Sequence, residues 1–140
     1  SYKGGKAYMN GYPIYVTSCS KLDDSLLATG FPYSDFTILK PFMRYMEWSM
    51  QHTHGLRRLG SAATDLIYVA CGRCDGYFEY GMKPYDVAAG AFVCQQAGAL
   101  VSDFSGGDNW LFGGEIVVAG PKLFPELLKS LQQFLKAKPE

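Results

Sequence analysis

The apolar positions of the chain alternate between two patterns, and this alternation predicts its fold. Short apolar or aromatic runs bounded by turn residues are typical of buried strands. Such runs occur at residues 12–17, 26–30, 56–59, 76–80, 99–104 and 115–119. Apolar residues at helical spacing indicate amphipathic helices. These segments are residues 35–51, 62–71, 122–136 and a stretch that begins at Tyr85 or Asp86 and ends at Ala97. Helices that alternate with short strands predict an α/β layered sandwich with a parallel or mixed central sheet flanked by helices.

Residues that start and stop helices sharpen these boundaries. Pro41 predicts either a helix start near Lys40 or a kink, because proline lacks the amide that an interior helical position needs. Ser61 is suited to cap the helix that follows it, and Gly72 to end that helix. The final segment places its leucines on one helical face: Leu123, Leu127, Leu128, Leu131 and Leu135.

Length and composition are those of one α/β domain spanning residues 1–140. Apolar residues make up 48% and charged residues 19%, which is typical of a folded domain rather than a disordered tail. Thirteen basic and thirteen acidic side chains balance, so no charge pattern predicts binding to nucleic acid or to an anionic membrane. No apolar run approaches the roughly 20 residues needed to span a bilayer. We therefore expect a soluble, cytoplasmic protein.

The cysteine and histidine pairs fit structural roles better than chemical ones. Cys71 and Cys74 form a C-x-x-C, but no second pair completes a zinc set, and a redox motif would begin a helix rather than end one. We therefore expect reduced thiols, also at Cys19 and Cys94. His52-Thr53-His54 could supply two metal ligands, although a solvated helix end before Gly55 is the favoured interpretation.

Two carboxylates and one glycine turn carry the candidate chemistry. Gly60-Ser61-Ala62 joins a strand to a helix start, where free N–H groups could bind an anion or a hydroxyl; an ordinary capped helix is the structural alternative. Asp86 could give an oxygen to Mg²⁺ or simply cap its helix. Glu79, seven residues earlier, could reach the same cleft and accept hydrogen bonds from a polyol, or be an exposed charge at a strand end.

Read together, these residues resemble the inositol monophosphatase family. Its second signature has the counterparts Tyr85-Asp86-Val87-Ala88-Ala89-Gly90 and Gln96-Ala97-Gly98-Ala99, with Tyr85 in place of the usual Trp and Gln96 in place of a frequent Glu. The runs 57–63 and 72–79 and the earlier segments 5–11 and 29–32 also resemble the family, in its bacterial form. The similarity covers nearly the whole chain, with order and spacing kept.

The resemblance implies a reaction and a set of roles. In that family Mg²⁺ activates a water molecule, which attacks the phosphorus of a phosphate monoester. The metal also stabilises the leaving alkoxide. The counterpart of Asp86 is a metal ligand that also contacts substrate, and the counterpart of Glu79 binds substrate hydroxyls. The counterparts of Gly60, Ser61 and Ala62 also contact substrate.

One part of the family pattern does not occur in this sequence. The first signature, Asp-Pro-(Ile/Leu)-Asp-Gly-Thr, and an earlier Glu-Glu pair supply most of the family's metal ligands, and no segment here matches them. We therefore expect the chain to be the C-terminal half of an inositol monophosphatase-type enzyme. That half would carry no catalytic residue beyond the metal ligand Asp86 and would be inactive alone. Its expected partners are the missing N-terminal half, a small phosphate monoester and further copies of itself, since an apolar face left open invites self-association.

Two alternatives remain open from the sequence. The enzyme could be a 3′(2′),5′-bisphosphate nucleotidase or a fructose-1,6-bisphosphatase-like member of the same class. The chain could also be a non-catalytic binding module that keeps the fold, which the missing first signature favours. The retention of Asp86, Glu79 and Gly60-Ser61 favours the enzyme.

Overall fold

A mixed sheet forms the centre of the molecule. The computed structural model describes residues 1–32 and 34–135. Within these residues a five-stranded sheet has the order β4-β3-β5-β7-β6. β4, β3 and β5 are parallel to one another, and β7 runs antiparallel to both β5 and β6. The strands are β3 (Leu26–Thr29), β4 (Gly55–Arg57), β5 (Gly76–Tyr80), β6 (Leu100–Ser102) and β7 (Glu115–Ala119).

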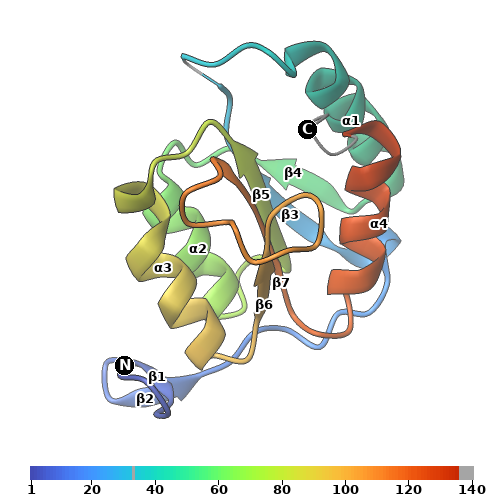
Figure 1. The fold of residues 1–140 in the computed structure, drawn as a ribbon. Coiled ribbons are helices and arrows are strands. Elements are labelled where there is room, and N and C mark those ends of the chain that lie inside the picture. Colours follow the sequence, from blue (N-terminus) through green and yellow to red (C-terminus); the bar gives the residue numbers. More distant parts are fainter. Residues whose placement is uncertain (33, 136–140) are drawn as a thin grey trace.

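Two pairs of helices cover the two faces of this sheet (Figure 1). One face carries α2 (Ala62–Ala70) and α3 (Pro84–Gln96), and the other carries α1 (Leu39–His52) and α4 (Phe124–Phe134). The predicted layered α/β fold is therefore confirmed, and the sheet is mixed.

The alternation of side chains along β5 explains why both faces are covered. Tyr77 belongs to the core beneath α2 and α3, whereas Phe78 and Tyr80 belong to the core beneath α1 and α4. Successive side chains of a strand point to opposite faces, so an apolar strand needs a layer on each side. All five residues of β5 are buried. Glu79, on the α2 and α3 side, is therefore a carboxylate held inside the fold.

The predicted strand at residues 12–17 is too long. The structure has a short strand β2 (Tyr12–Ile14), which pairs antiparallel with β1 (Ala7–Met9) in a separate hairpin. Asn10 and Gly11 both have positive φ, 52° and 83°, as the two central residues of a tight hairpin turn require. Beyond β2 the chain leaves the hairpin, and the amide of Val16 donates to the carbonyl of Ala97, 3.1 Å away.

Local hydrogen bonds account for the shifted start of α1 and end of β6, whereas the strands predicted at 26–30 and 56–59 are found at 26–29 and 55–57. α1 begins at Leu39 rather than 35, because the Asp35 carboxylate accepts from the amide of Thr37 (3.0 Å) in a turn before the helix. Pro41 is thus in the first turn, as one of the two predictions had it. β6 ends at Ser102 because Asp103 folds the next residues into a loop, accepting from the amide of Gly107 at 2.8 Å. α4 ends at Phe134; the predicted end at 136 lies outside the described residues.

The histidine and cysteine pairs lie at or just beyond the C-terminal ends of α1 and α2. His52 is the exposed last residue of α1, and its ring stacks on Trp48 with centroids 4.4 Å apart. Cys71 follows the last residue of α2, and the four cysteines, all of them described, are free thiols. Among the described residues, no helix is both long and apolar enough to cross a bilayer.

Candidate functional site

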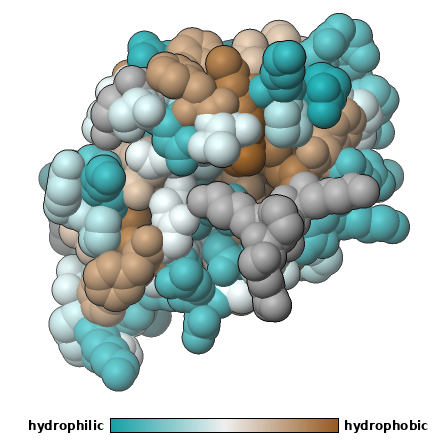
Figure 2. All heavy atoms as spheres, turned by 45° about the horizontal axis from the view of Figure 1, so that its top comes forward, coloured by the Kyte–Doolittle hydropathy of each residue, from teal (hydrophilic) through white to brown (hydrophobic). Residues whose placement is uncertain are grey.

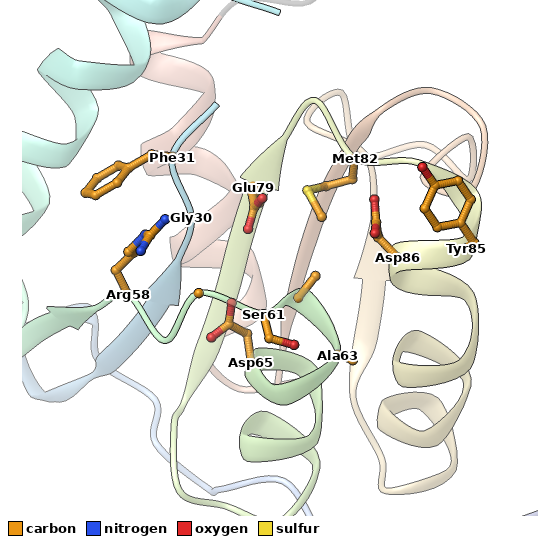
Figure 3. Close-up of a pocket in the computed structure, with 12 residues that line it drawn as sticks. Gly30, Phe31, Arg58, Ser61, Ala63, Asp65, Glu79, Met82, Tyr85 and Asp86 are labelled. Atoms are coloured by element: carbon orange, nitrogen blue, oxygen red, sulfur yellow. The ribbon is translucent and has the colours of Figure 1, made fainter. Parts of the chain in front are cut away.

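A cavity of about 370 Å³ opens at the edge of the sheet where the parallel strands end. Its volume falls within the roughly 300–1,000 Å³ of small-molecule sites. The lining brings every sequence-predicted site residue together (Figure 3). The lining residues are Gly30, Phe31, Arg58, Gly60, Ser61, Ala62, Ala63, Asp65, Glu79, Met82, Tyr85 and Asp86.

The topology explains why these residues meet. β3, β4 and β5 are parallel, so their carboxyl ends lie at one edge of the sheet. The chain leaves β4 and β5 there and enters α2 and α3, whose first turns face the same cavity (Figure 3). Helix N-termini carry free N–H groups and partial positive charge. The site therefore combines anion-binding backbone with carboxylate side chains.

The turn at residues 60–62 caps a helix and also lines the cavity. Gly60 has φ = +84°, a left-handed conformation that glycine adopts without strain. Ser61 then caps α2, its hydroxyl accepting from the amide of Thr64 at 3.3 Å. Gly60, Ser61 and Ala62 also line the cavity. An ordinary cap and a place in a binding site are therefore compatible here.

Glu79 lies near the end of β5 with only 7% of its surface exposed. It is thus not the exposed strand-end charge of the structural alternative. The hydroxyl of Tyr77 donates to its Oε1 at 2.9 Å. Burial raises the pKa of Glu79 to about 7, although the Tyr77 hydrogen bond opposes part of the rise. A Cβ on Gly30, which follows β3, would overlap the Glu79 carboxylate, so a larger residue there would require this side chain to move.

Asp86 is the third residue of α3, which begins two residues earlier at Pro84. The predicted helix start at Tyr85 or Asp86 is therefore wrong, because proline suits a first helical position whose amide needs no partner. Asp86 reaches back, and its Oδ2 accepts from the amide of Lys83 at 3.0 Å. Its side chain is half-buried, and its charge is one of the influences that raise the pKa of Glu79.

The sequence interpretation missed Asp65 and Arg58. Asp65, the fourth residue of α2, is 1% exposed, and its Oδ1 has no hydrogen-bond partner within the described chain. Burial raises its pKa to about 6, and the positive charge of Arg58 lowers it in part. The Arg58 guanidinium lies 5.2 Å from the centre of the Phe31 ring. An ionisable residue inside the apolar run 62–71 was the signal available in the sequence.

The carboxylates of the cavity are the kind of ligand that a hard cation prefers, but too few of them lie close together to hold one. Mg²⁺ takes oxygen ligands, and Asp86, Glu79 and Asp65 all line the cavity. Across the described residues, however, no three Asp, Glu, His or Cys side chains come close enough to hold a metal ion. These residues can therefore contribute to a metal site but do not complete one.

Comparison with known proteins gives a consistent assignment. A model of the inositol monophosphatase family matches residues 1–136. The putative Nus factor SuhB of Neisseria meningitidis serogroup B is 42% identical over 127 residues, which cover 91% of this chain and 49% of that protein. The Nus factor SuhB of Escherichia coli K12 is 38% identical over 133 residues, covering 95% and 50%. The chain thus spans about half the length of these curated relatives.

Solved structures agree with the sequence matches. The extragenic suppressor protein SuhB of Bartonella henselae superposes with a TM-score of 0.89 at 30% identity, over 95% of this chain and 51% of that one. The inositol monophosphatase of Anabaena gives a TM-score of 0.86 at 36% identity, over 94% and 54%. The fold described above is therefore shared with about half of each of these chains.

Proposed function

The chain belongs to the inositol monophosphatase family, and from this we propose that it is one half of a Mg²⁺-dependent phosphatase. The substrate class is a small phosphate monoester such as inositol 1-phosphate, which the enzyme hydrolyses to the polyol and phosphate. In this proposal residues 1–140 form a single α/β domain. The N-terminal half of the same protein supplies the ligands that complete the metal site.

The observation that carries the proposal is the pairing of Glu79 and Asp86 in one cavity with the first turns of α2 and α3. A phosphate monoester has an anionic end and a hydroxyl-bearing end. Free N–H groups at a helix start suit the anionic end, and a buried carboxylate suits the hydroxyls. The cavity offers both within one volume, which a purely structural pair of capped helices does not require.

Each residue has a task that its surroundings support. The backbone at Gly60, Ser61 and Ala62 contacts the substrate through the exposed start of α2. Glu79, positioned by Tyr77, accepts a hydrogen bond from a hydroxyl of the substrate. Asp86, oriented by the Lys83 amide, gives one carboxylate oxygen to the metal and contacts the substrate. Mg²⁺, when bound, activates water and stabilises the leaving oxygen.

The remaining metal ligands must come from outside these residues, since one or two carboxylates hold Mg²⁺ only together with further oxygens. The isolated chain is therefore inactive. We also propose that it associates with copies of itself, because large apolar side chains are exposed on it. Large hydrophobic or aromatic side chains that are exposed include Tyr12 (76%), Tyr85 (82%) and Phe112 (78%). Figure 2 shows hydrophobic residues, in brown, among polar ones on one face of the molecule.

Phosphate release tests the proposal directly. Inositol 1-phosphate is supplied with Mg²⁺ to three proteins: the 140-residue chain, the full-length protein and its Asp86→Asn variant. Activity is expected in the full-length protein alone, with a loss of about 100-fold or more on Asp86→Asn, because removal of a metal ligand impairs both metal binding and substrate contact. The exposed Asp24→Asn serves as the matched control and should keep full activity. Activity in the short chain would contradict the assignment of the missing ligands.

The same assay separates substrate classes. Adenosine 3′,5′-bisphosphate and fructose 1,6-bisphosphate are compared with inositol 1-phosphate by kcat/KM, which measures discrimination between substrates. A preference for either bisphosphate would identify the protein as a bisphosphate nucleotidase or a fructose-1,6-bisphosphatase-like enzyme. It would still be a phosphatase.

A non-catalytic binding role is the second candidate, and one observation favours it. The relatives at 42% and 38% identity are named Nus factors rather than phosphatases. A full-length protein that hydrolyses none of the three substrates with Mg²⁺ present, yet is folded, would support this role.

A further inference from the structure

Asp65 is a buried carboxylate that the fold leaves incompletely paired. It lines the cavity, it is 1% exposed, and its Oδ1 accepts no hydrogen bond within the described residues. An unpaired buried polar atom costs stability, and native structures contain few of them. A helix such as α2 would bury an apolar residue at this position at no such cost. The carboxylate therefore lacks a hydrogen-bond partner among the described residues, and a partner from elsewhere would lower this cost.

The positive charge of Arg58 influences Asp65 but does not supply this hydrogen bond. Arg58 is close enough for its charge to lower the pKa of Asp65. The Arg58 side chain is itself exposed, with its guanidinium beside the Phe31 ring. No hydrogen bond from it reaches Oδ1, which is among the unpaired buried atoms. The donor must therefore come from outside the described residues, and the open cavity gives a ligand access to this atom.

The chemistry of the cavity selects the class of that donor. Asp65 and Glu79 project from α2 and β5 toward the same space (Figure 3), and the charge of Asp65 raises the pKa of Glu79. Two neighbouring carboxylates repel a phosphate group but accept hydrogen bonds from hydroxyls. A polyol presents hydroxyls on adjacent carbons, so one molecule can donate to both side chains. An alcohol without further hydroxyls can donate to neither once it is esterified.

We infer that Asp65 accepts a hydrogen bond from a hydroxyl of the substrate's alcohol half and, beside Glu79, selects polyol phosphates over simple phosphate esters. This inference rests on the proposed function, because it assigns a part of the same cavity. Asp65 contacts neither the phosphorus nor the leaving oxygen in this arrangement. Its effect is on the choice of substrate rather than on the chemical step.

The test compares two substrates that differ only in hydroxyls. Inositol 1-phosphate and cyclohexyl phosphate share the six-membered ring and the ester. Each ester is supplied to the full-length protein and to its Asp65→Asn and Asp65→Ala variants. The quantity measured is kcat/KM for every combination of protein and ester. A hydrogen bond to a charged acceptor corresponds to about a 10- to 100-fold effect. We expect a loss of that size with inositol 1-phosphate and less than about a twofold change with cyclohexyl phosphate.

Outcomes that contradict the inference are equally definite. Equal losses on both substrates in both variants would show that Asp65 acts through the fold, and no loss on either would show that water is its partner. Asp24→Asn removes the same charge from an exposed position outside the cavity and should change neither rate. Melting temperatures of all variants identify any that are unfolded.

Binding separates this inference from the proposed function. Calorimetric titration of inositol 1-phosphate is made on the same proteins. If the wild type hydrolyses neither ester but binds inositol 1-phosphate at least tenfold more tightly than Asp65→Asn does, the phosphatase proposal fails and the role of Asp65 stands. Binding that is independent of Asp65 overturns the inference whatever the activity, and the absence of both binding and hydrolysis overturns both.

Discussion

Replacing Asp65 by asparagine should stabilise the folded protein at neutral pH, although it removes a charge from a proposed binding site. Burial raises the pKa of Asp65 from its ordinary value of 3.8 to about 6. A difference of about two pKa units corresponds to about 3 kcal/mol of unfavourable free energy for the ionised form in the fold. Water in the cavity screens part of this, and asparagine still leaves a buried amide there. We expect a gain of about 1–2 kcal/mol, or about 2–6 °C in Tm for a protein twice this length.

The gain has a definite dependence on pH. The pKa of Asp65 is higher in the folded than in the unfolded state, so the folded state binds its proton more tightly. The contribution of the protonated Asp65 carboxyl to the free energy of unfolding is therefore fully present below about pH 4. It is lost as the pH rises through about 6. The advantage of Asp65→Asn should accordingly be near zero at pH 3.5, grow through pH 6 and remain constant above about pH 7.

Thermal unfolding of the full-length protein, followed by circular dichroism from pH 3.5 to 8 without substrate or metal, measures this difference. Asp24→Asn is the matched control, and its Tm difference from the wild type should show no rise of this kind around pH 6. A constant difference at every pH would mean that asparagine acts through packing rather than charge. A wild type more stable than the variant at pH 8 would refute the reasoning, since the carboxylate would then have a favourable partner in the folded protein.

Three further substitutions test the packing and positioning around the cavity, each in the full-length protein. Gly90→Ala should lower the free energy of unfolding, measured in urea, by about 1 kcal/mol. The new Cβ would lie 2.7 Å from the Cβ of Leu66. The cost of this overpacking, about 1–3 kcal/mol, outweighs the gain of about 1 kcal/mol in helix propensity. Tyr77→Phe should raise the pKa of Glu79 above its value of about 7, because it removes the hydrogen bond that favours the carboxylate; a ¹³C NMR titration would detect this. Ser61→Ala should cost about 0.5–1 kcal/mol in the same urea assay, through loss of the α2 cap.

The elements that the sequence predicted best are those with strong periodicity and clear ends. β5 and β7 have the predicted limits, and α2 begins at the residue after its predicted cap. Side-chain period and capping chemistry are local properties, so a single sequence suffices to predict them. The hairpin of β1 and β2 is also local, and Asn10-Gly11 was the signal for it.

Other features depend on contacts between distant residues and have no local signal. Residues 15–17, predicted as part of a strand, lie outside any strand, and the Val16 amide donates to Ala97 just after α3 instead of to a neighbouring strand. The position of β7 between β5 and β6, antiparallel to both, is likewise decided by how the strands pair along their length.

The residues of the candidate site also fall into those with a local sequence signal and those without a clear one. Asp65 belongs to the second group, which explains why it was not predicted. Glu79, Asp86 and residues 60–62 were predicted as candidates because they lie at ends of elements and belong to segments that resemble the family's motifs. Asp65 lies inside a helix, where its exposure depends on what packs against it, and a solvated face would be the ordinary prediction. The fold buries it at the cavity with an unpaired oxygen, a cost that a structural role does not explain. A buried carboxylate with an unpaired oxygen is a stronger indication of ligand binding than a residue that also caps a helix, because the cap by itself explains the presence of the second residue.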